Sequence, residues 1–441
     1  MNLHKVSNFL TVRFSRNYLG LNQLLKLFYL RFLLLFTLDR MFSQIKHLAC
    51  IGGFLYFLSS CAPQDTVLIN PNCFSQLHRS LIKTTAKVVK TQVPHNKHSR
   101  YEIFDVLTTR DSLFYYGLDL NNLTLNIFEI SKGFKESISI NVPTLDKASG
   151  ISVYSRDSIF VFRDMPVKLF LINQKGVLIN QWDLGSAPVD WDLSNEYYLE
   201  DYQHMKPLLA NGLLHLILSP LDYFYHNEKS RLKLFATYDL ANKEWVKLYG
   251  GPKGVYLKNN IELPYEHGLP SRIIIGNYSY VSYPVDHYIY KYDYITGSLI
   301  DKLCASSRHI GKFSKIPDLG ADMQQRLEFL ITTAYYGKLN YHKDVKLVSR
   351  VVFHETPLFD VGGNMSDFCD RTISIMYFDE QMNFIEETEA NPLDLNYFNE
   401  FMVALDNGFL LSPICESKYL SNYSDDGLAL NLIKTLVYMN E

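Results

Sequence analysis

Short apolar segments alternate with polar turns along the chain from about Tyr101 onward. The segments are rich in Val, Ile, Tyr and Phe, and clusters of Asn, Asp, Gly and Lys separate them. Little of this region shows the 3.6-residue periodicity of an amphipathic helix, whereas short strands bounded by turn residues account for it well. The pattern therefore predicts an all-β fold.

One phrase recurs five times: an apolar strand ends in an acidic or amide residue, and turn residues and a second strand follow. The residues that end these strands are Glu129, Asn173, Asp239, Asp293 and Asp379, about sixty positions apart on average. Side chains of this kind cap hairpin turns by accepting hydrogen bonds from backbone N–H groups ahead of them. We therefore expect five capped β-hairpins.

A second phrase, Asn or Asp followed by a strand, precedes the hairpins and supplies further strands. It occurs at residues 111–114, 157–160, 211–214, 277–280 and 407–410. A ring of four-stranded sheets leaves only short edges exposed to other chains. Five hairpins and a final strand region at Leu428–Tyr438 therefore predict a six-bladed β-propeller over residues 101–441. Seven blades are a less favoured alternative, and so is a β-sandwich pair, which would lack the sixty-residue superperiod.

Three local features complete the predicted fold. Apolar residues spaced three and four apart predict one inserted helix near 319–334. The last strand, at 432–438, is expected to share a blade with the region around 87–93, because propellers often close by pairing strands from the two termini. The glycine-rich segment 250–254 lacks the strand-to-helix context of a phosphate-binding loop and is expected to be a turn between blades.

The residues before the repeats carry an export signal. An eleven-residue apolar run, Leu48–Leu58, follows a candidate start at Met41 and the basic residue Lys46, and it ends in Ser59-Ser60-Cys61. Small residues just before a cysteine form the lipobox of a bacterial lipoprotein, where the peptidase needs small side chains and the thiol is joined to diacylglycerol by a thioether. The run is too short to cross a membrane. Residues 41–60 are therefore a predicted lipoprotein signal peptide, with Cys61 as the lipid anchor.

The regions on either side of this signal are less informative. Residues 1–40 are interpreted as an extension from a misassigned start codon, with a membrane-associated extension as the alternative, and residues 61–100 as the anchor linker and the start of the first blade. No acidic residue directly follows Cys61, which favours the outer membrane over the inner membrane. The sequence leaves open whether the protein faces the periplasm or the cell surface.

The charge and the cysteine content restrict which partners and which covalent or metal cross-links the sequence allows. After residues 1–60 the chain has 36 basic and 45 acidic residues, a formal net charge of −9, which argues against nucleic acid as a partner. Four cysteines remain beyond the anchor, and their spacing fits no zinc finger. The oxidising compartment permits disulfides, and three pairings are open among Cys73, Cys304, Cys369 and Cys415.

The segment Tyr336-Gly337-Lys338-Leu339-Asn340-Tyr341-His342-Lys343, followed by Arg350 on a strand, resembles part of an uncharacterised family of lipoproteins from Bacteroidota. The layout from lipobox to last strand is also similar. The chain departs from the family at His342 and at Lys343-Asp344-Val345, where the family has Tyr-Asp-Lys. The resemblance implies a TolB-like six-bladed β-propeller. It implies no activity and supplies no catalytic residues.

Chemistry-bearing residues form one cluster. Carboxylates lie among aromatic side chains, as a sugar-cleaving site requires, although turn carboxylates beside strand aromatics would give the same pattern. The members are Asp190, Asp192, Glu196, Glu200 and Asp201, with Trp182, Trp191, Tyr197, Tyr198 and Tyr202. The neighbouring histidines, His204, His215 and His226, are expected in the core or on the surface. Aromatic segments at 221–226 and 282–288 resemble loops with exposed aromatic side chains and are candidate rim contacts, although tyrosine is also a favoured strand residue.

The sequence favours an envelope-anchored lipoprotein that acts as a non-enzymatic binding or scaffolding propeller for a protein or glycan. It contacts the membrane through Cys61. One alternative is a glycan-active hydrolase or lyase that carries the carboxylate cluster in the propeller funnel, and another is a sensor partner of an envelope signalling system. No catalytic, cofactor-binding or metal-binding residue is predicted.

Overall fold

The protein is described by a computed structural model. The described residues are 82–92, 103–163, 167–184, 197–199, 207–220, 232–258, 263, 265–268, 270–313, 316–317, 321–366, 371–390, 403–406, 409–413 and 427–437. They belong to the second of two compact units, which cover 1–65 and 66–441. The extension at 1–40, the signal peptide and Cys61 lie outside the described residues.

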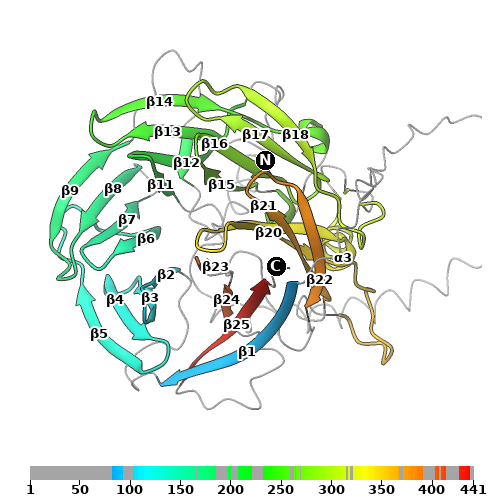
Figure 1. Ribbon diagram of the computed structural model, residues 1–441, viewed down its shortest axis with the longest axis horizontal. Coiled ribbons are helices and arrows are strands. Elements are labelled where there is room, and N and C mark those ends of the chain that lie inside the picture. Colours follow the sequence, from blue (N-terminus) through cyan, green and yellow to red (C-terminus); the bar gives the residue numbers. More distant parts are fainter. Residues whose placement is uncertain are drawn as a thin grey trace, which may run out of the picture. The chain divides into compact units, whose positions relative to one another are not determined.

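Five antiparallel sheets follow one another along the chain, each made of consecutive strands. Figure 1 shows them around a common centre, with the last strand of each sheet on the outer rim. The first sheet contains β2 (Ile103–Thr108), β3 (Leu113–Asp119), β4 (Thr124–Glu129) and β5 (Gly133–Ser139), and the second β6 (Gly150–Ser155), β7 (Ser158–Arg163), β8 (Lys168–Ile172) and β9 (Leu178–Asp183). The third contains β10 (Tyr197–Leu199), β11 (Leu208–Ala210), β12 (Leu213–Pro220), β13 (Phe235–Asp239) and β14 (Glu244–Tyr249). The fourth contains β15 (Ser271–Ile275), β16 (Tyr278–Ser282), β17 (Tyr288–Asp293) and β18 (Leu299–Cys304), and the fifth β19 (Tyr335–His342), β20 (Leu347–Phe353), β21 (Ile373–Asp379) and β22 (Phe384–Ala390).

A further sheet joins the two ends of the repeat region. It contains β1 (Ile82–Gln92), β25 (Gly427–Val437), β24 (Phe409–Pro413) and β23 (Val403–Ala404), in that order. β1 and β25 pair antiparallel over their full length, with Lys87 opposite Leu432, so the predicted pairing of the chain ends is confirmed. β1 also contacts β5 on one side and β22 on the other.

The all-β propeller prediction is confirmed. The prediction of six blades is not confirmed. The described residues form five blades that each consist of consecutive strands. The region expected to form one more blade of this kind instead contributes β23, β24 and β25 to the sheet that also takes up β1. The second repeated phrase begins the second strand of its sheet in each case, as at Asp157 before β7.

The hairpin turns follow the predicted capping in four of the five cases. The Asp293 carboxylate accepts hydrogen bonds from the backbone N–H groups of Ile295 and Thr296, at 2.9 and 2.8 Å. Asn173, Asp239 and Asp379 also accept from backbone N–H groups in their turns. Glu129 differs, because its longer side chain accepts a hydrogen bond from Ser112 and pairs with Lys132.

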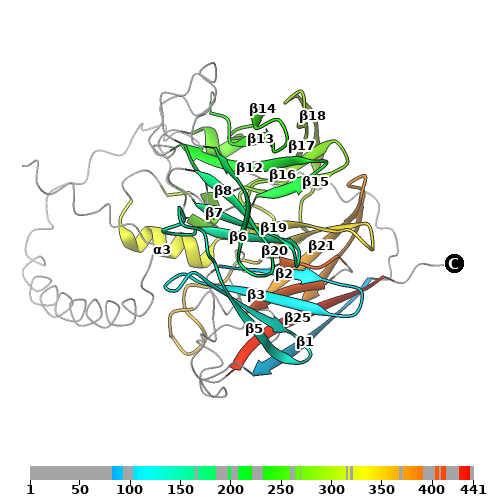
Figure 2. The same cartoon turned by 90° about the vertical axis from the view of Figure 1, so that its left-hand side faces the viewer.

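The inserted helix is shorter than predicted. α3 spans Met323–Thr332 and begins there because the side chain of Asp322 accepts a hydrogen bond from the backbone N–H of Gln325, whose own side chain completes a capping box. Met323, expected on its apolar face, is 78% exposed, whereas Phe329 is buried. Figure 2 shows α3 at one face of the ring. Two short helical turns, η7 (Gly254–Leu257) and α2 (Tyr265–Gly268), lie between β14 and β15. Among the described residues, no helix is long and apolar enough to cross a bilayer.

The blades bury their faces against one another. One apolar cluster extends from Phe235 in the third blade through Val281 to Val348 in the fifth. Arg350 is fully buried in this region, and its guanidinium donates to the carbonyl oxygens of Ala305 and Asp286, both at 2.7 Å. Burial lowers its pKa to about 10. The arginine of the family-like segment thus joins the loops of the fourth blade to the fifth.

A glycine pair tests the contact between the first two blades. Gly176 and Gly276 both have positive φ, but a Cβ at Gly176 would lie 1.9 Å from the Ser139 carbonyl oxygen, whereas one at Gly276 would meet nothing within 4 Å. We expect Gly276→Ala to lower the free energy of unfolding by about 1 kcal/mol through backbone strain alone. Gly176→Ala should lower it by about 3 kcal/mol, because the clash adds to this strain. Denaturant unfolding measures both, and equal losses would contradict the close approach of the blades.

His342 is a neutral histidine within the fold. Its Nδ1 lies 3.0 Å from the Leu405 carbonyl oxygen and must donate to it, and its Nε2 lies 2.8 Å from the Ser349 hydroxyl and accepts from it. Burial lowers its pKa from 6.5 to about 4. Between these values the unfolded chain binds a proton that the folded chain does not.

The stability of the fold should therefore fall as the pH is lowered from about 6.5 towards 4, and His342 should contribute up to ~1.4 kcal/mol per pH unit. In His342→Asn, an amide that still donates to Leu405 replaces the titrating ring. This variant should be less stable at pH 7, but its free energy of unfolding should fall less steeply as the pH is lowered. Urea unfolding at each pH measures this free energy. An unchanged slope would show that His342 is not held neutral.

Candidate functional site

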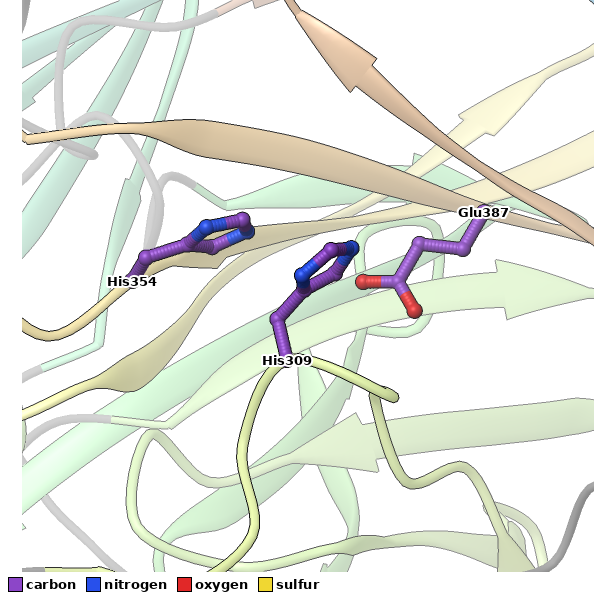
Figure 3. Close-up of side chains that lie close together, drawn as sticks. All are labelled: His309, His354 and Glu387. Atoms are coloured by element: carbon purple, nitrogen blue, oxygen red, sulfur yellow. The ribbon is translucent and has the colours of Figure 1, made fainter.

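Three side chains with metal-binding chemistry meet where the chain passes from the fourth blade to the fifth. His309 lies on the segment that leaves β18, His354 directly follows β20, and Glu387 lies on β22. One ligand atom from each lies within 4.8 Å of the others. Figure 3 shows the imidazole of His309 between His354 and the Glu387 carboxylate.

The Glu387 carboxylate is buried and firmly held. Oε1 accepts hydrogen bonds from the hydroxyls of Ser307 and Ser374, both at 2.6 Å. Oε2 accepts one from the backbone N–H of Arg308, at 3.0 Å. Because a carboxylate has about four acceptor positions, these three bonds leave one on Oε2. Hydrogen bonds to a charged acceptor are stronger than those between neutral groups, so they compensate the burial of the carboxylate.

Ser374 determines the protonation of His354. The serine hydroxyl has a single proton and donates it to Glu387, so the His354 Nε2, 3.0 Å from the same oxygen, must be the donor in that contact. The neutral ring therefore carries its lone pair on Nδ1. Burial, with the nearby charges of His309 and Arg308, lowers the His354 pKa to about 4.

His309 stacks on His354, with ring centroids 4.3 Å apart and planes at 19°. The Arg308 Nε–H donates to the His309 Nε2 at 3.0 Å, so this nitrogen presents a lone pair. Glu389 lies farther away, with an oxygen 3.6 Å from the same nitrogen. We take the shorter contact as the one that sets the tautomer, because 3.6 Å exceeds a hydrogen bond.

The cluster continues into a buried hydrogen-bond network. The backbone N–H of Ser307 donates to the Tyr336 hydroxyl at 2.9 Å, and that hydroxyl lies 2.7 Å from the His287 Nδ1. Burial raises the Tyr336 pKa above its usual value. The Arg350 guanidinium lies 3.5 Å from the centre of the Tyr336 ring. The site is thus supported by groups from both blades.

A serine, a histidine and a glutamate lie together here, but they do not form a catalytic triad. In a triad the carboxylate orients the imidazole, and the imidazole takes the serine proton. Here Ser374 gives its proton to Glu387 and accepts one from His354. The Ser374 side chain is also fully buried. This arrangement can hold a cation or a polar ligand, but it does not activate a nucleophile.

Most of the site residues predicted from the sequence are not among the residues whose side chains the structure describes. The lipid anchor Cys61 and the carboxylates Asp190, Asp192, Glu196, Glu200 and Asp201 lie outside the residues whose side chains the structure describes, as do His204, His226 and the segment 221–226. Trp182 is buried and donates to the Leu240 carbonyl oxygen. His215 is a core residue, as expected, and burial lowers its pKa to about 3.

The prediction of exposed aromatic contacts at 282–288 is wrong. Tyr283 is fully buried and donates to the Gly251 carbonyl oxygen at 2.6 Å, and His287 is also buried. The neighbouring blade covers this turn, which the local sequence does not reveal. The glycine-rich segment at 250–254 does lie between blades, as predicted.

The sequence offered no signal for the histidine and glutamate cluster. His309, His354 and Glu387 are spread over three separate parts of two blades, and no short motif contains two of them. The packing of the fourth blade on the fifth brings them together. Only strand pairing combined with blade packing could have identified them.

Two solved structures from Bacteroides resemble this fold. A member of the DUF4221 family from Bacteroides vulgatus superposes with a TM-score of 0.61 at 14% identity, covering 82% of this chain and 100% of that one. A Bacteroides fragilis protein, named as exported, has a TM-score of 0.47 at 13% identity and covers 80% of this chain and 95% of that one. No protein-family model and no curated protein matches the chain. The first likeness supports the propeller fold alone.

Two neighbouring carboxylates test the role assigned to Glu387. Glu387→Gln should lower the free energy of unfolding by about 1–3 kcal/mol, because an amide cannot accept from both serines and the Arg308 N–H together. Glu389→Gln should be nearly neutral, because the Glu389 side chain is 61% exposed. Equal effects in chemical denaturation would show that the buried carboxylate does not organise the junction.

Proposed function

We propose that this protein is an exported, lipid-anchored β-propeller that binds a protein partner and catalyses no reaction. The lipobox ending at Cys61 supports export and anchoring. Cys304, at the end of β18, is bonded in a disulfide, as an oxidising compartment permits. The outer membrane is the proposed location, because no acidic residue directly follows the anchor cysteine.

The proposed ring has six blades. The sheet of β1, β25, β24 and β23 has the four antiparallel strands of a blade and contacts strands on both sides. We count it as the sixth blade, formed from the two ends of the chain. The likeness of the fold to a Bacteroides vulgatus protein supports placing the chain in an uncharacterised Bacteroidota lipoprotein family.

The observation that carries the binding proposal is an ordered apolar loop between β20 and β21. Phe359 and Met365 form a β-bridge, and their side chains are 55% and 54% exposed. Val361, between them, is fully exposed. The Asp360 carboxylate holds the turn by accepting from the backbone N–H of Asn364, at 2.8 Å. An ordered loop that displays several large apolar side chains is typical of a contact surface.

The chemistry of this loop favours a protein partner. Residues 355–366 contain no Lys or Arg and carry the acidic residues Glu355 and Asp360, so the loop lacks the basic charge that attracts anionic lipids. Within 355–366, Phe359 is the one aromatic residue, and this part of the loop provides no paired platform for sugar rings. Exposed Met and Phe are enriched at protein interfaces. In Figure 2 this segment and α3 lie towards the same face of the ring.

Site-specific photocrosslinking in cells tests this proposal. A photoreactive phenylalanine at Val361 should give a discrete adduct with one protein. The same group at Ile300, an exposed apolar residue on the outer strand β18, should not. This control is also an exposed apolar residue, at 52%, but it lies on a different surface, so equal adducts at both positions, or none at Val361, would rule out a specific contact through the loop.

The anchor is tested in the same strain. Wild-type protein should incorporate a clickable fatty acid, Cys61→Ala should not, and Cys73→Ala should still be labelled. The Val361 adduct should weaken in Cys61→Ala, because the tether no longer concentrates the protein at the membrane. Labelling that persists in Cys61→Ala would overturn the proposed anchor.

A further inference from the structure

The cluster of His309, His354 and Glu387 has the donor set of a transition-metal site. Two imidazoles and one carboxylate are the ligands of many three-residue zinc centres. Nitrogen donors suit Zn²⁺, Ni²⁺ and Cu²⁺, whereas Ca²⁺ and Mg²⁺ prefer oxygen donors throughout. We propose that these three residues bind one divalent transition-metal ion, of the Zn²⁺ class, at the junction of the fourth and fifth blades.

The hydrogen bonds around the ligands fit this role. Metal-binding histidines generally donate their second ring N–H to a neighbouring acceptor, which fixes the tautomer. In His354, Nε2 is the nitrogen that faces the other two ligands (Figure 3), and it donates to Ser374, so a metal ion bound there would replace this hydrogen bond and leave the ring proton on Nδ1. The two serines and the Arg308 N–H hold the Glu387 carboxylate in place, with an acceptor position left on Oε2. Glu387 is therefore oriented in advance, whereas His354 must move its ring proton from Nε2 to Nδ1.

Arg308 already places a positive charge in the cluster. Its Nε–H donates to the His309 Nε2, and its NH2 group donates to the Glu387 backbone carbonyl, both at 3.0 Å. The lone pair that a metal would take from His309 thus accepts a hydrogen bond from a guanidinium. Arg308 is exposed, so its side chain is able to turn into solvent. We infer that Arg308 is an internal cation that competes with the metal.

Binding requires the ligand atoms to come closer together and the two stacked imidazoles to be reoriented. A Zn–N bond of about 2.0–2.1 Å brings tetrahedral ligand atoms to about 3.4 Å from one another, whereas these donors lie within 4.8 Å. The stacked imidazoles must therefore turn towards each other. His309 lies on the segment between blades, and its side chain is 22% exposed, so its ring has more room to turn than the buried Glu387. Glu389, near the His309 Nε2, is in reach as a fourth ligand.

Zinc titration of the full chain, purified in mild detergent, tests the proposal. Calorimetry should show one Zn²⁺ per chain, and Co²⁺ should give the visible absorption of a tetrahedral nitrogen and oxygen site. His309→Ala and His354→Ala should each weaken binding by at least about 10-fold. Arg308→Gln keeps all three ligands and should tighten binding by about five-fold, because it removes the competing charge.

The matched control is Glu386→Gln. Glu386 is adjacent to Glu387 on β22, and alternation along the strand directs its side chain to the opposite face, so zinc affinity should not change. Circular dichroism checks that each variant is folded. No stoichiometric zinc binding by the wild type, zinc binding that survives both histidine substitutions, or weaker binding in Arg308→Gln would each overturn the site. The proposal does not depend on the lipid anchor or the protein partner.

Discussion

The structure depends on one constraint: the described blades carry apolar side chains on the faces that meet, so each of these blades needs a neighbour. Apolar clusters cross the boundaries between successive blades. One joins the first and second blades, another the second and third, and a third extends from the third blade through the fourth to the fifth. A ring is the arrangement in which no blade face is left exposed. Here the eleven-residue pairing of β1 with β25 joins the two ends of the repeat region. Without it, the faces of the first and fifth blades would lie open to water.

Packing of this kind forces polar groups between the blades to find partners inside the protein. The two terminal nitrogens of Arg350 donate to carbonyl oxygens of the fourth blade, and Glu387 accepts from hydroxyls and an N–H of both blades. In a low-dielectric interior these bonds are strong, and their loss is costly. The junction of the fourth and fifth blades is therefore held by polar contacts as well as by apolar area.

The two proposed activities use the fifth blade in different ways. The apolar loop at 358–366 extends from it, and the proposed cation site lies where the preceding segment packs against it. A rigid ring can present both because loops vary without disturbing the sheets that support them. Fold likeness alone assigns neither role, so each proposal is based on the contacts of its own residues.

The local elements were largely readable from the sequence, because hairpins and turns are specified by neighbouring residues. Asp293 and its counterparts cap their turns as predicted, and the strand that pairs with β1 was identified. The start of α3 was misplaced by four residues because Asp322 caps it, a competition that apolar spacing alone does not show. The turn at 282–288 was wrongly placed at the surface, since the covering residues come from another part of the chain.

Alternating patterns along the chain thus determined the fold class, the hairpins and their capping residues, because these depend on contacts between nearby positions. The tertiary structure decided which residues from distant parts of the chain are buried together and which are exposed. It buried Tyr283 and Arg350, left Val361 in solvent, and brought His309, His354 and Glu387 within 4.8 Å of one another. These outcomes follow from the packing of one blade on the next, which joins residues far apart in the chain and leaves no trace in their local sequence.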